Sequence, residues 1–377
     1  MNLKLSEEQE MLKTMARDFL TNKYPKTVVK EIQADEKGYS VPLWKEMAEL
    51  GWQGLVIPDK YGGNGMNFQD LSVLLEEMGR FCLPGPFFAT VMLGAYPLMD
   101  AGTEEQKQEY LPQIAAGKII FTLALNEADA QYKPSSITVK AVSDKDDYVI
   151  TGTKLFVPSA NSADYIICIA RTADKANPEE GISAFIVNAK SAGVTSTVLR
   201  TIDSEKLCEV VFNNVRVPKR NLLGKPDGGW SLVKKTIERA AVARCCDTAG
   251  GLQQVLDMTI QYAKDRKQFD QPIGKFQIIQ HYCANMATDV DGLKFVTYQA
   301  VWLQSEGLFS AKEVSIAKAW ASEASERVLS LAHQIHGAIG VTIDHDLQYY
   351  TKRIKAAAAT YGDAEFHREI VAQQMGL

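Results

Sequence analysis

Hydrophobic residues change their spacing twice along the chain, and each change predicts a different kind of structure. Up to about residue 118 they recur every three or four positions, the spacing of amphipathic helices. Two such stripes are Met11, Leu12, Met15 and Phe19, then Phe68, Leu71, Leu74, Leu75 and Met78. Ser6 followed by Gln9, and Thr103 followed by Gln106, have the spacing of capping boxes and predict helix starts. We therefore expect an N-terminal helical domain.

Between Ile119 and about Leu223 the apolar residues lie in short runs rich in β-branched and aromatic side chains. The runs are 119–125, 135–143, 146–158, 163–171, 181–189, 193–199 and 208–218. Turn residues such as DKDD at 144–147 and NPEEG at 177–181 separate them, and no helical pattern intervenes. Closely spaced strands of this kind predict an antiparallel β-barrel or sandwich.

After Trp230 the helical period returns and continues to the end of the chain. Four long amphipathic segments cover 231–265, 277–305, 311–336 and 344–374, which predicts a four-helix bundle. The predicted fold class is therefore α+β. We expect a helical domain at 1–118, a β domain at 119–224 and a bundle at 225–377.

Composition excludes several classes of protein. The chain has 377 residues, is 46% hydrophobic and 23% charged, and carries a formal net charge of −5, so we expect no nucleic-acid partner. No apolar run approaches the roughly 18 residues of a membrane span, and the string MNLKLSEEQEMLK at 1–13 has no signal-peptide core. The six cysteines form no CxxC pair and two are adjacent, which favours reduced thiols in the cytoplasm. We predict no metal site.

Five strings carry a resemblance to a known family. They are LGWQGLVIPDKYGGNGMNFQDLSVLLEEMGR (50–80), GTEEQKQEYLPQIAAGK (102–118), VVFNNVRVPKRNLLGKPDGGW (210–230), YAKDRKQFDQPIGKFQIIQH (262–281) and QIHGAIGVTIDHDLQYYTKRIKA (334–356). In this order they resemble the acyl-CoA dehydrogenase family over almost the whole chain. The resemblance implies an FAD flavoprotein that oxidises acyl-CoA thioesters and passes electrons to an electron-transferring flavoprotein. It also implies a homotetramer or an α2β2 heterotetramer.

The catalytic base departs from the family's commonest pattern. Most members carry the base as the Glu of a Tyr-Glu-Gly-Thr string, where this chain has Gly362. A minority place the Glu on the first bundle helix, directly before an Arg, and Glu238 and Arg239 match that arrangement. We therefore predict Glu238 as the base and Arg239 as a coenzyme A contact; the alternative is a solvated helix carboxylate. Asp363 is the second candidate base, with a helix cap beside an unusual Gly362 backbone as its alternative.

The flavin site is expected from segments that resemble the family's FAD contacts. Arg266 and Phe269 match an R-x-x-F segment that reaches a neighbouring subunit's FAD, and Gln334 and Gly337 match a segment near the adenine. Asp270 and Ala338 replace glycines that are usual in these two segments. On the β domain the matching positions are Asn126, Phe156 and Pro158; Pro158 replaces a Thr usual near the flavin.

The resemblance places the acyl cleft along LPGPFFATVMLGAYPL at 83–98, which is apolar except for Thr90 and Tyr96. This segment favours a branched or cyclic acyl group and disfavours a free ω-carboxylate; ordinary helix packing is the alternative. Two other functions remain open. One is a catalytically weak partner subunit of a heteromeric dehydrogenase, and the other is an enoyl-CoA reductase with the same fold.

Overall fold

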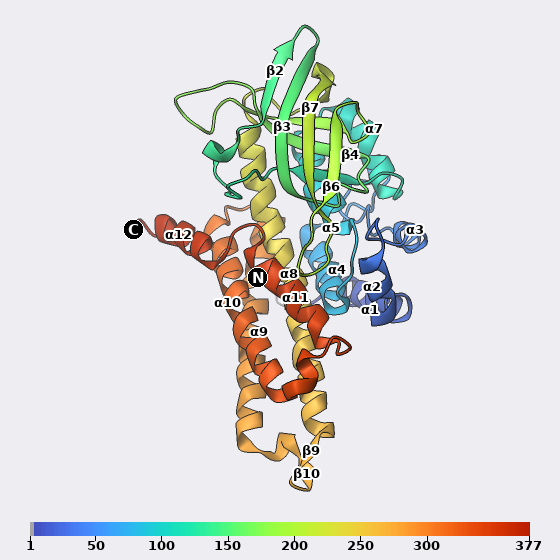
Figure 1. Cartoon of the computed structure of the whole chain (residues 1–377), viewed down its shortest axis with the longest axis vertical. Coiled ribbons are helices and arrows are strands. Elements are labelled where there is room, and N and C mark those ends of the chain that lie inside the picture. Colours follow the sequence, from blue (N-terminus) through green and yellow to red (C-terminus); the bar gives the residue numbers. More distant parts are fainter. Residues whose placement is uncertain (1–3) are drawn as a thin grey trace. The chain divides into compact units, whose positions relative to one another are not determined.

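The computed structural model describes residues 4–377, so Met1 to Leu3 of the N-terminal string lie outside the described residues. The chain divides into two compact units. Unit 1 comprises Met1–Val29, Asn67–Leu83 and Ala241–Leu377, and unit 2 comprises Lys30–Met66 and Pro84–Ala240. Helix α8 (Gly229–Asp265) contributes residues to both units, and Figure 1 shows it as one unbroken helix. The boundaries expected at 118/119 and 224/225 stay predictions.

Unit 1 is helical. Its helices are α1 (Glu7–Lys23), α4 (Phe68–Phe81), the part of α8 from Ala241, α9 (Gln277–Ser305), α10 (Ala311–His336), α11 (Leu347–Ala359) and α12 (Ala364–Gln374). The two-residue strands β9 (Lys267–Gln268) and β10 (Gln271–Pro272) form a hairpin between α8 and α9. Helices α9 and α10 pack along one another (Figure 1). The predicted helical character of this end of the chain is confirmed.

Helix α1 begins at the predicted capping box of Ser6 and Gln9 but buries a different face from the predicted one. Its buried residues are Leu12, Ala16 and Leu20, while Met11 is 72% and Met15 40% exposed. A spacing of four keeps positions 12, 16 and 20 on one side of the helix, and that side packs on α4. The stripe predicted on α1 was therefore wrong for its two methionines. The stripe on α4 is confirmed, because all five of its residues are buried.

Helices α4 and α8 cross with their backbones in contact inside unit 1. A Cβ atom on Gly79 would lie 1.8 Å from the carbonyl oxygen of Asp247, and one on Gly250 would lie 1.8 Å from that of Glu76. No side chain larger than hydrogen fits at such distances, so these two glycines permit the close approach.

The fourth segment predicted for the bundle, 344–374, is not one helix. Helix α11 ends at Ala359 and α12 begins at Ala364, and between them Tyr361 (φ 61°) and Gly362 (φ 98°) have left-handed backbones. The buried Lys318 of α10 holds the break, since its Nζ donates to the carbonyl oxygens of Ala358 and Gly362 at 2.8 Å each. Helical periodicity continues across 344–374, and the sequence pattern therefore concealed this interruption.

Unit 2 contains the sheet. Its strands are β1 (Phe121–Ala124), β2 (Lys140–Asp144), β3 (Asp147–Pro158), β4 (Tyr165–Arg171), β5 (Ile182–Asn188), β6 (Val194–Val198), β7 (Leu207–Pro218) and β8 (Leu222–Leu223). The order is β6-β7-β3-β2-β4-β5-β8, with β1 beside β4. Pairing is antiparallel except where β4 meets β1 and β2. Each predicted run contains one strand, and the mixed α+β fold class is confirmed.

Short helices complete unit 2. They are α3 (Val41–Glu49), α5 (Phe87–Thr90), the π-helical turn η2 (Val91–Ala95), α6 (Tyr96–Ala101) and α7 (Glu104–Ala115), while α2 (Lys26–Ala34) joins the two units in sequence. Short 3₁₀ turns cover Asp59–Tyr61, Pro134–Ser136 and Lys219–Asn221 in unit 2, and Ile273–Lys275 and Gly337–Val341 in unit 1. Helix α7 begins at the predicted capping box of Thr103 and Gln106. All six cysteines are free thiols, as predicted, and no helix within residues 4–377 is long and apolar enough to cross a membrane.

Candidate functional site

Glu238 lies in the first turns of α8 and belongs to unit 2. Its side chain is half-buried, and no hydrogen bond or ion pair joins its carboxylate to another described residue. Burial raises its pKa above the ordinary value, while the positive charges of Lys234 and Arg239 oppose that rise. A partly desolvated carboxylate without a partner has the properties expected of a general base.

Arg239, the predicted coenzyme A contact, is held by two residues of α6. Its Nη1 lies 2.7 Å from Oδ2 of Asp100, and its guanidinium carbon lies 4.1 Å from the centre of the Tyr96 ring. Lys235 reaches the other oxygen of the same carboxylate, with its Nζ 2.6 Å from Oδ1 of Asp100. The structure thus brings Arg239 directly against Tyr96, two predicted substrate residues, and adds Asp100, which the sequence analysis did not single out.

Thr90, the other residue predicted in the acyl cleft, is fully buried at the end of α5. Its hydroxyl donates to the backbone carbonyl of Phe121 at 3.5 Å, a long hydrogen bond. This contact is the ordinary packing that the sequence analysis gave as the alternative to a substrate role. Substrate binding by Thr90 stays a prediction.

Asp363, the second candidate base, belongs to unit 1 and caps a helix. Its side chain is exposed and accepts a hydrogen bond from the backbone N–H of Phe366 at 2.9 Å, at the start of α12. Gly362 before it has a left-handed backbone. The capping alternative predicted for this string is therefore confirmed. The carboxylate of Asp363 already accepts a hydrogen bond from a backbone N–H.

His367 follows one turn after Asp363 and is buried. Its Nε2 lies 2.9 Å from the carbonyl oxygen of Tyr361 and therefore donates, which leaves Nδ1 to accept from the Ser315 hydroxyl at 3.1 Å. Burial lowers the pKa of His367 to about 4. His367 is therefore part of a buried polar network that joins α10 to the break before α12.

An open cavity of about 630 Å³ runs beside Asp363 along α10, α11 and α12 of unit 1. Residues of both charge signs line it, including Glu326, Lys355, Asp363 and Arg368. Arg368 forms an ion pair with Glu323 across the cavity wall. The cavity is open to solvent, and charged residues line only part of it.

The three β-domain residues predicted at the flavin lie close together in unit 2. Asn126 follows β1, and its carbonyl accepts from the backbone N–H of Leu155 in β3 at 2.8 Å. Phe156 follows Leu155 in β3 and has a left-handed backbone (φ 55°) at an irregularity in the β3–β7 pairing. The residue is 43% exposed. The side-chain oxygen Oδ1 of Asn126 is buried without a hydrogen-bond partner. An unused acceptor beside a projecting aromatic ring fits the polar edge and face of a flavin ring.

Pro158 ends strand β3, and its carbonyl accepts from the Thr122 hydroxyl at 2.5 Å. The neighbouring Ser159 also has a left-handed backbone (φ 53°), and its N–H donates to the carbonyl of Lys206. The backbone group of Ser159 is thus already paired within the protein.

A buried ion pair that the sequence analysis missed supports this part of the sheet. Lys154 is fully buried, and its Nζ lies 2.7 Å from Oε1 of Glu127 and 2.9 Å from the carbonyl oxygen of Leu125. Glu127 also accepts from the backbone N–H groups of Thr138 and Val139. The pair therefore fixes residues 125–127 against β3 on either side of Asn126. The sequence offered no local signal for this pair, because Lys154 ends the polar run TGTK at 151–154.

The four remaining flavin candidates are exposed residues of unit 1. Arg266 and Phe269 lie at and after the end of α8, and Gln334 and Gly337 lie at the end of α10. Phe269 is 87% exposed and forms the β9–β10 turn with Asp270, both with left-handed backbones (φ 52° and 60°). Asp270 therefore adopts the left-handed conformation that glycine adopts most readily. A projecting phenylalanine of this exposure is available for contact with another molecule.

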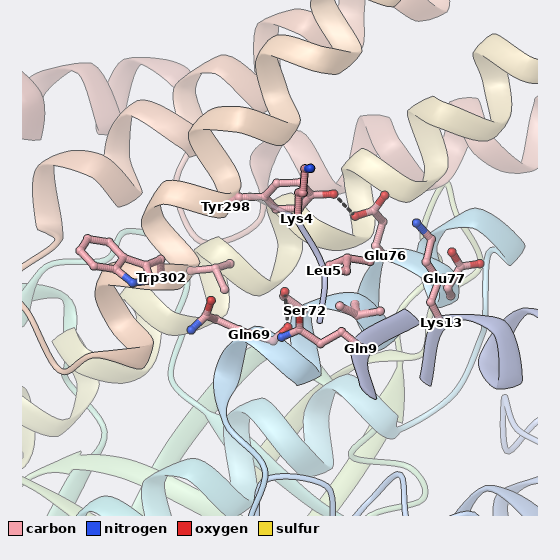
Figure 2. Close-up of a pocket in the computed structure, with 12 residues that line it drawn as sticks. Lys4, Leu5, Gln9, Lys13, Gln69, Ser72, Glu76, Glu77, Tyr298 and Trp302 are labelled. Carbon is pink, nitrogen blue, oxygen red and sulfur yellow. Dashed lines mark hydrogen bonds between the residues drawn. The ribbon is translucent and has the colours of Figure 1, made fainter. Parts of the chain in front are cut away.

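A second, smaller crevice in unit 1 lies among α1, α4 and α9 (Figure 2). In Figure 2 Tyr298 of α9 directs its hydroxyl to Oε2 of Glu76, a hydrogen bond of 2.6 Å. The neighbouring Glu77 pairs with Arg17. The volume of about 60 Å³ is small for a ligand, and these two carboxylates pair with the protein. Among residues 4–377, no cluster of His, Cys, Asp and Glu could hold a metal ion.

Comparison with known proteins covers the chain from end to end. The N-terminal, middle and C-terminal domains described for acyl-CoA dehydrogenases match residues 6–118, 122–215 and 227–376. The probable acyl-CoA dehydrogenase YngJ of Bacillus subtilis is 33% identical over all of both chains. The caffeyl-CoA reductase–Etf complex subunit CarC of Acetobacterium woodii is 30% identical over 97% of each chain.

The fold agrees with a solved structure of the same kind. Butyryl-CoA dehydrogenase from Megasphaera elsdenii superposes with a TM-score of 0.93, covers all of both chains and is 27% identical. The domain matches, the full-length relative and this superposition agree with the five strings that carried the resemblance. The chain belongs to the acyl-CoA dehydrogenase family.

Proposed function

We propose that this protein is an FAD-dependent acyl-CoA dehydrogenase in which Glu238 removes the α-proton of an acyl-CoA thioester. Members of its family are flavoprotein oxidoreductases. The observation that carries the proposal is the state of Glu238, a half-buried carboxylate without a hydrogen-bond or ion-pair partner among the described residues.

The reaction requires a base with particular properties, and Glu238 has them. An α-proton beside a thioester is a weak acid, so its removal requires a positioned base that is not neutralised by a nearby cation. Burial raises the pKa of Glu238, which makes its carboxylate a stronger base. Asp363 is less suited, because it is exposed and accepts the cap hydrogen bond of α12.

The residues present fit FAD. In unit 2 the unpartnered Oδ1 of Asn126 and the exposed ring of Phe156 would hold the flavin ring, while Pro158 offers no hydroxyl. In unit 1 the exposed residues Arg266, Phe269, Gln334 and Gly337 would contact the adenosine diphosphate part of a neighbour's FAD. Bound FAD would supply the acceptor for the hydride that leaves the β-carbon, and an electron-transferring flavoprotein would reoxidise it.

This arrangement requires more than one chain. If Arg266 and Phe269 serve the FAD of a neighbour, a monomer lacks part of each flavin site. We therefore expect at least a dimer and propose a homotetramer or an α2β2 heterotetramer. Sedimentation that shows a stable monomer with bound FAD would contradict this expectation.

The acyl group is proposed to be branched or cyclic. The segment 83–98 forms α5, η2 and the start of α6, and most of its residues are buried. The segment itself carries no charged residue, and Arg239, the cation that stacks on its Tyr96, is already paired with Asp100, so nothing here favours an acyl group that ends in a carboxylate. Butyryl-, isovaleryl- and cyclohexanecarbonyl-CoA are suitable trial substrates.

The test compares the two carboxylates. Glu238→Gln keeps the shape of the side chain but cannot accept the proton, so turnover should fall roughly 10²- to 10⁴-fold while FAD content stays normal. Asp363→Asn is the matched control, and its turnover should stay near that of the wild type. Flavin bleaching by acyl-CoA in stopped flow measures both variants. Full turnover in Glu238→Gln would rule out this base.

A relative named as a reductase favours one second candidate, an enoyl-CoA reductase that works in the opposite direction. The same glutamate would then deliver the α-proton. Reduced enzyme mixed with an enoyl-CoA should reoxidise faster than oxidised enzyme is bleached by the saturated thioester. FAD per chain tests the remaining alternative, because one FAD per two chains would indicate a catalytically weak partner subunit.

A further inference from the structure

Glu238 has no ion-pair partner because the cations near it are bound by other carboxylates. The inference drawn from this arrangement rests on the proposed function. The charged side chains linked to it directly or through an ion pair are Lys234, Lys235 and Arg239 on α8, Asp100 on α6 and Glu179 in the β4–β5 loop. Lys234 and Arg239 are the two cations that act on Glu238. Neither forms an ion pair with it.

Each of these cations is bound by a different carboxylate. Arg239 lies 2.7 Å from Asp100, and both side chains are largely buried, at 13% and 17% exposure. Lys234 lies 3.1 Å from Glu179, but both of these side chains are about half exposed. Solvent weakens the second pair much more than the first, so Asp100 is the stronger of the two restraints.

We infer that Asp100 is a positioning residue for the reaction: it draws Arg239 and Lys235 to α6 and thereby keeps Glu238 free of an ion pair. The geometry around Arg239 supports this role. Its guanidinium stacks on Tyr96 while Nη1 is bound to Asp100, so both contacts hold it toward α6. Asp100 also balances part of the positive charge that would otherwise stabilise the carboxylate of Glu238 and weaken it as a base.

Asp100→Asn tests the inference, because it keeps the shape of the side chain and removes its charge. The released Arg239 and Lys235 should then favour the ionised form of Glu238. The acidic limb of the profile of kcat/KM against pH should move to lower pH by on the order of one unit. Turnover on the plateau should fall as well, since a weaker base removes the proton more slowly.

Two readouts separate positioning from a merely structural role. The first is the pH profile of the holoenzyme with whichever of butyryl-, isovaleryl- and cyclohexanecarbonyl-CoA turns over fastest. The second needs no turnover: the infrared band of the protonated Glu238 carboxyl, identified as the band that Glu238→Gln lacks, is followed against pH. Asp100→Glu should restore both midpoints, and Glu179→Gln is the matched control, with a smaller shift.

The outcomes are distinct. An infrared midpoint that moves down in Asp100→Asn, and by more than in Glu179→Gln, supports the inference. A midpoint equal to that of the wild type, or a changed KM with an unmoved acidic limb, overturns it. If Asp100→Asn does not fold, Lys235→Met replaces it, and a midpoint that falls on loss of this cation overturns the inference. Full turnover in Glu238→Gln instead overturns the proposed function, while the infrared midpoint still tests Asp100.

Discussion

The starts of helices α8 and α12 each present a carboxylate, and their surroundings are opposite. Glu238 is half-buried, has no hydrogen-bond or ion-pair partner within residues 4–377, and has a raised pKa. Asp363 is exposed and accepts a hydrogen bond from the first turn of its helix. Residue type alone does not separate them. What separates them is whether the carboxylate already accepts a hydrogen bond from another group of the protein.

The comparison extends to the groups behind each carboxylate. At α8 the polar neighbours are bound to one another and leave Glu238 free. At α12 the polar neighbours, Lys318 and His367, bind the chain itself through the carbonyls of Ala358, Tyr361 and Gly362. The first network surrounds the proposed base, and the second stabilises a sharp break between two helices.

The break at α12 should be sensitive to a single methyl group. Gly362→Ala would place a Cβ 2.4 Å from the Phe366 ring and 2.8 Å from His367, on a backbone with φ 98°. Strain and overpacking together should lower the free energy of unfolding by about 4 kcal/mol. Gly307→Ala is the control, because its φ is also positive (67°) but nothing lies within 4 Å. Equal losses in the two variants, measured by urea denaturation, would contradict this account.

The same region should also be sensitive to acid. His367 has a pKa of about 4 in the folded protein against 6.5 as its ordinary value, so the unfolded chain binds more protons between these pH values. Stability from this residue is complete above pH 6.5 and is lost as the pH falls toward 4, by about 3 kcal/mol in all. His367→Gln should flatten the dependence of unfolding free energy on pH in this window. An equally steep pH dependence in His367→Gln and in the wild type would contradict this account.

The smallest expected effect concerns the cap itself. Asp363→Ala removes the acceptor for the Phe366 N–H and should cost about 1 kcal/mol of unfolding free energy. Asp363→Asn keeps a capping oxygen and should cost less. Turnover should not change in either variant. Loss of turnover in a correctly folded Asp363→Asn protein would reverse the comparison and make Asp363 the base.

Interactions within one or two turns of chain were predictable from the sequence. The capping boxes at Ser6 and Thr103 and the buried stripe of α4 were predicted correctly, since each depends on residues a few positions apart. The face of α1 was predicted wrongly, because burial depends on the helix packed against it. The break at Gly362 was missed in placing the helix, although its backbone was expected to be unusual.

The site shows the same limit. The pair of Arg239 and Asp100 joins positions 139 residues apart, and that of Lys154 and Glu127 joins positions 27 apart, so neither is visible in a local pattern. The family strings placed Glu238 and Arg239 but not the residue that holds Arg239. Which charges pair across a fold can be predicted only when the fold is known.

Helix α8 has a consequence for how the protein folds. Roughly its first dozen residues, which include Glu238 and Arg239, belong to unit 2, and the rest belong to unit 1. A helical stretch of about twelve residues is marginal in water without support. The turns that carry Glu238 are supported by the burial of Trp230, Val233 and Ile237, and they continue without a break into the part of α8 that belongs to unit 1. Because one helix runs through both units, loss of structure in either unit should fray the turns that carry the proposed base, and folding of the two units should be coupled through α8.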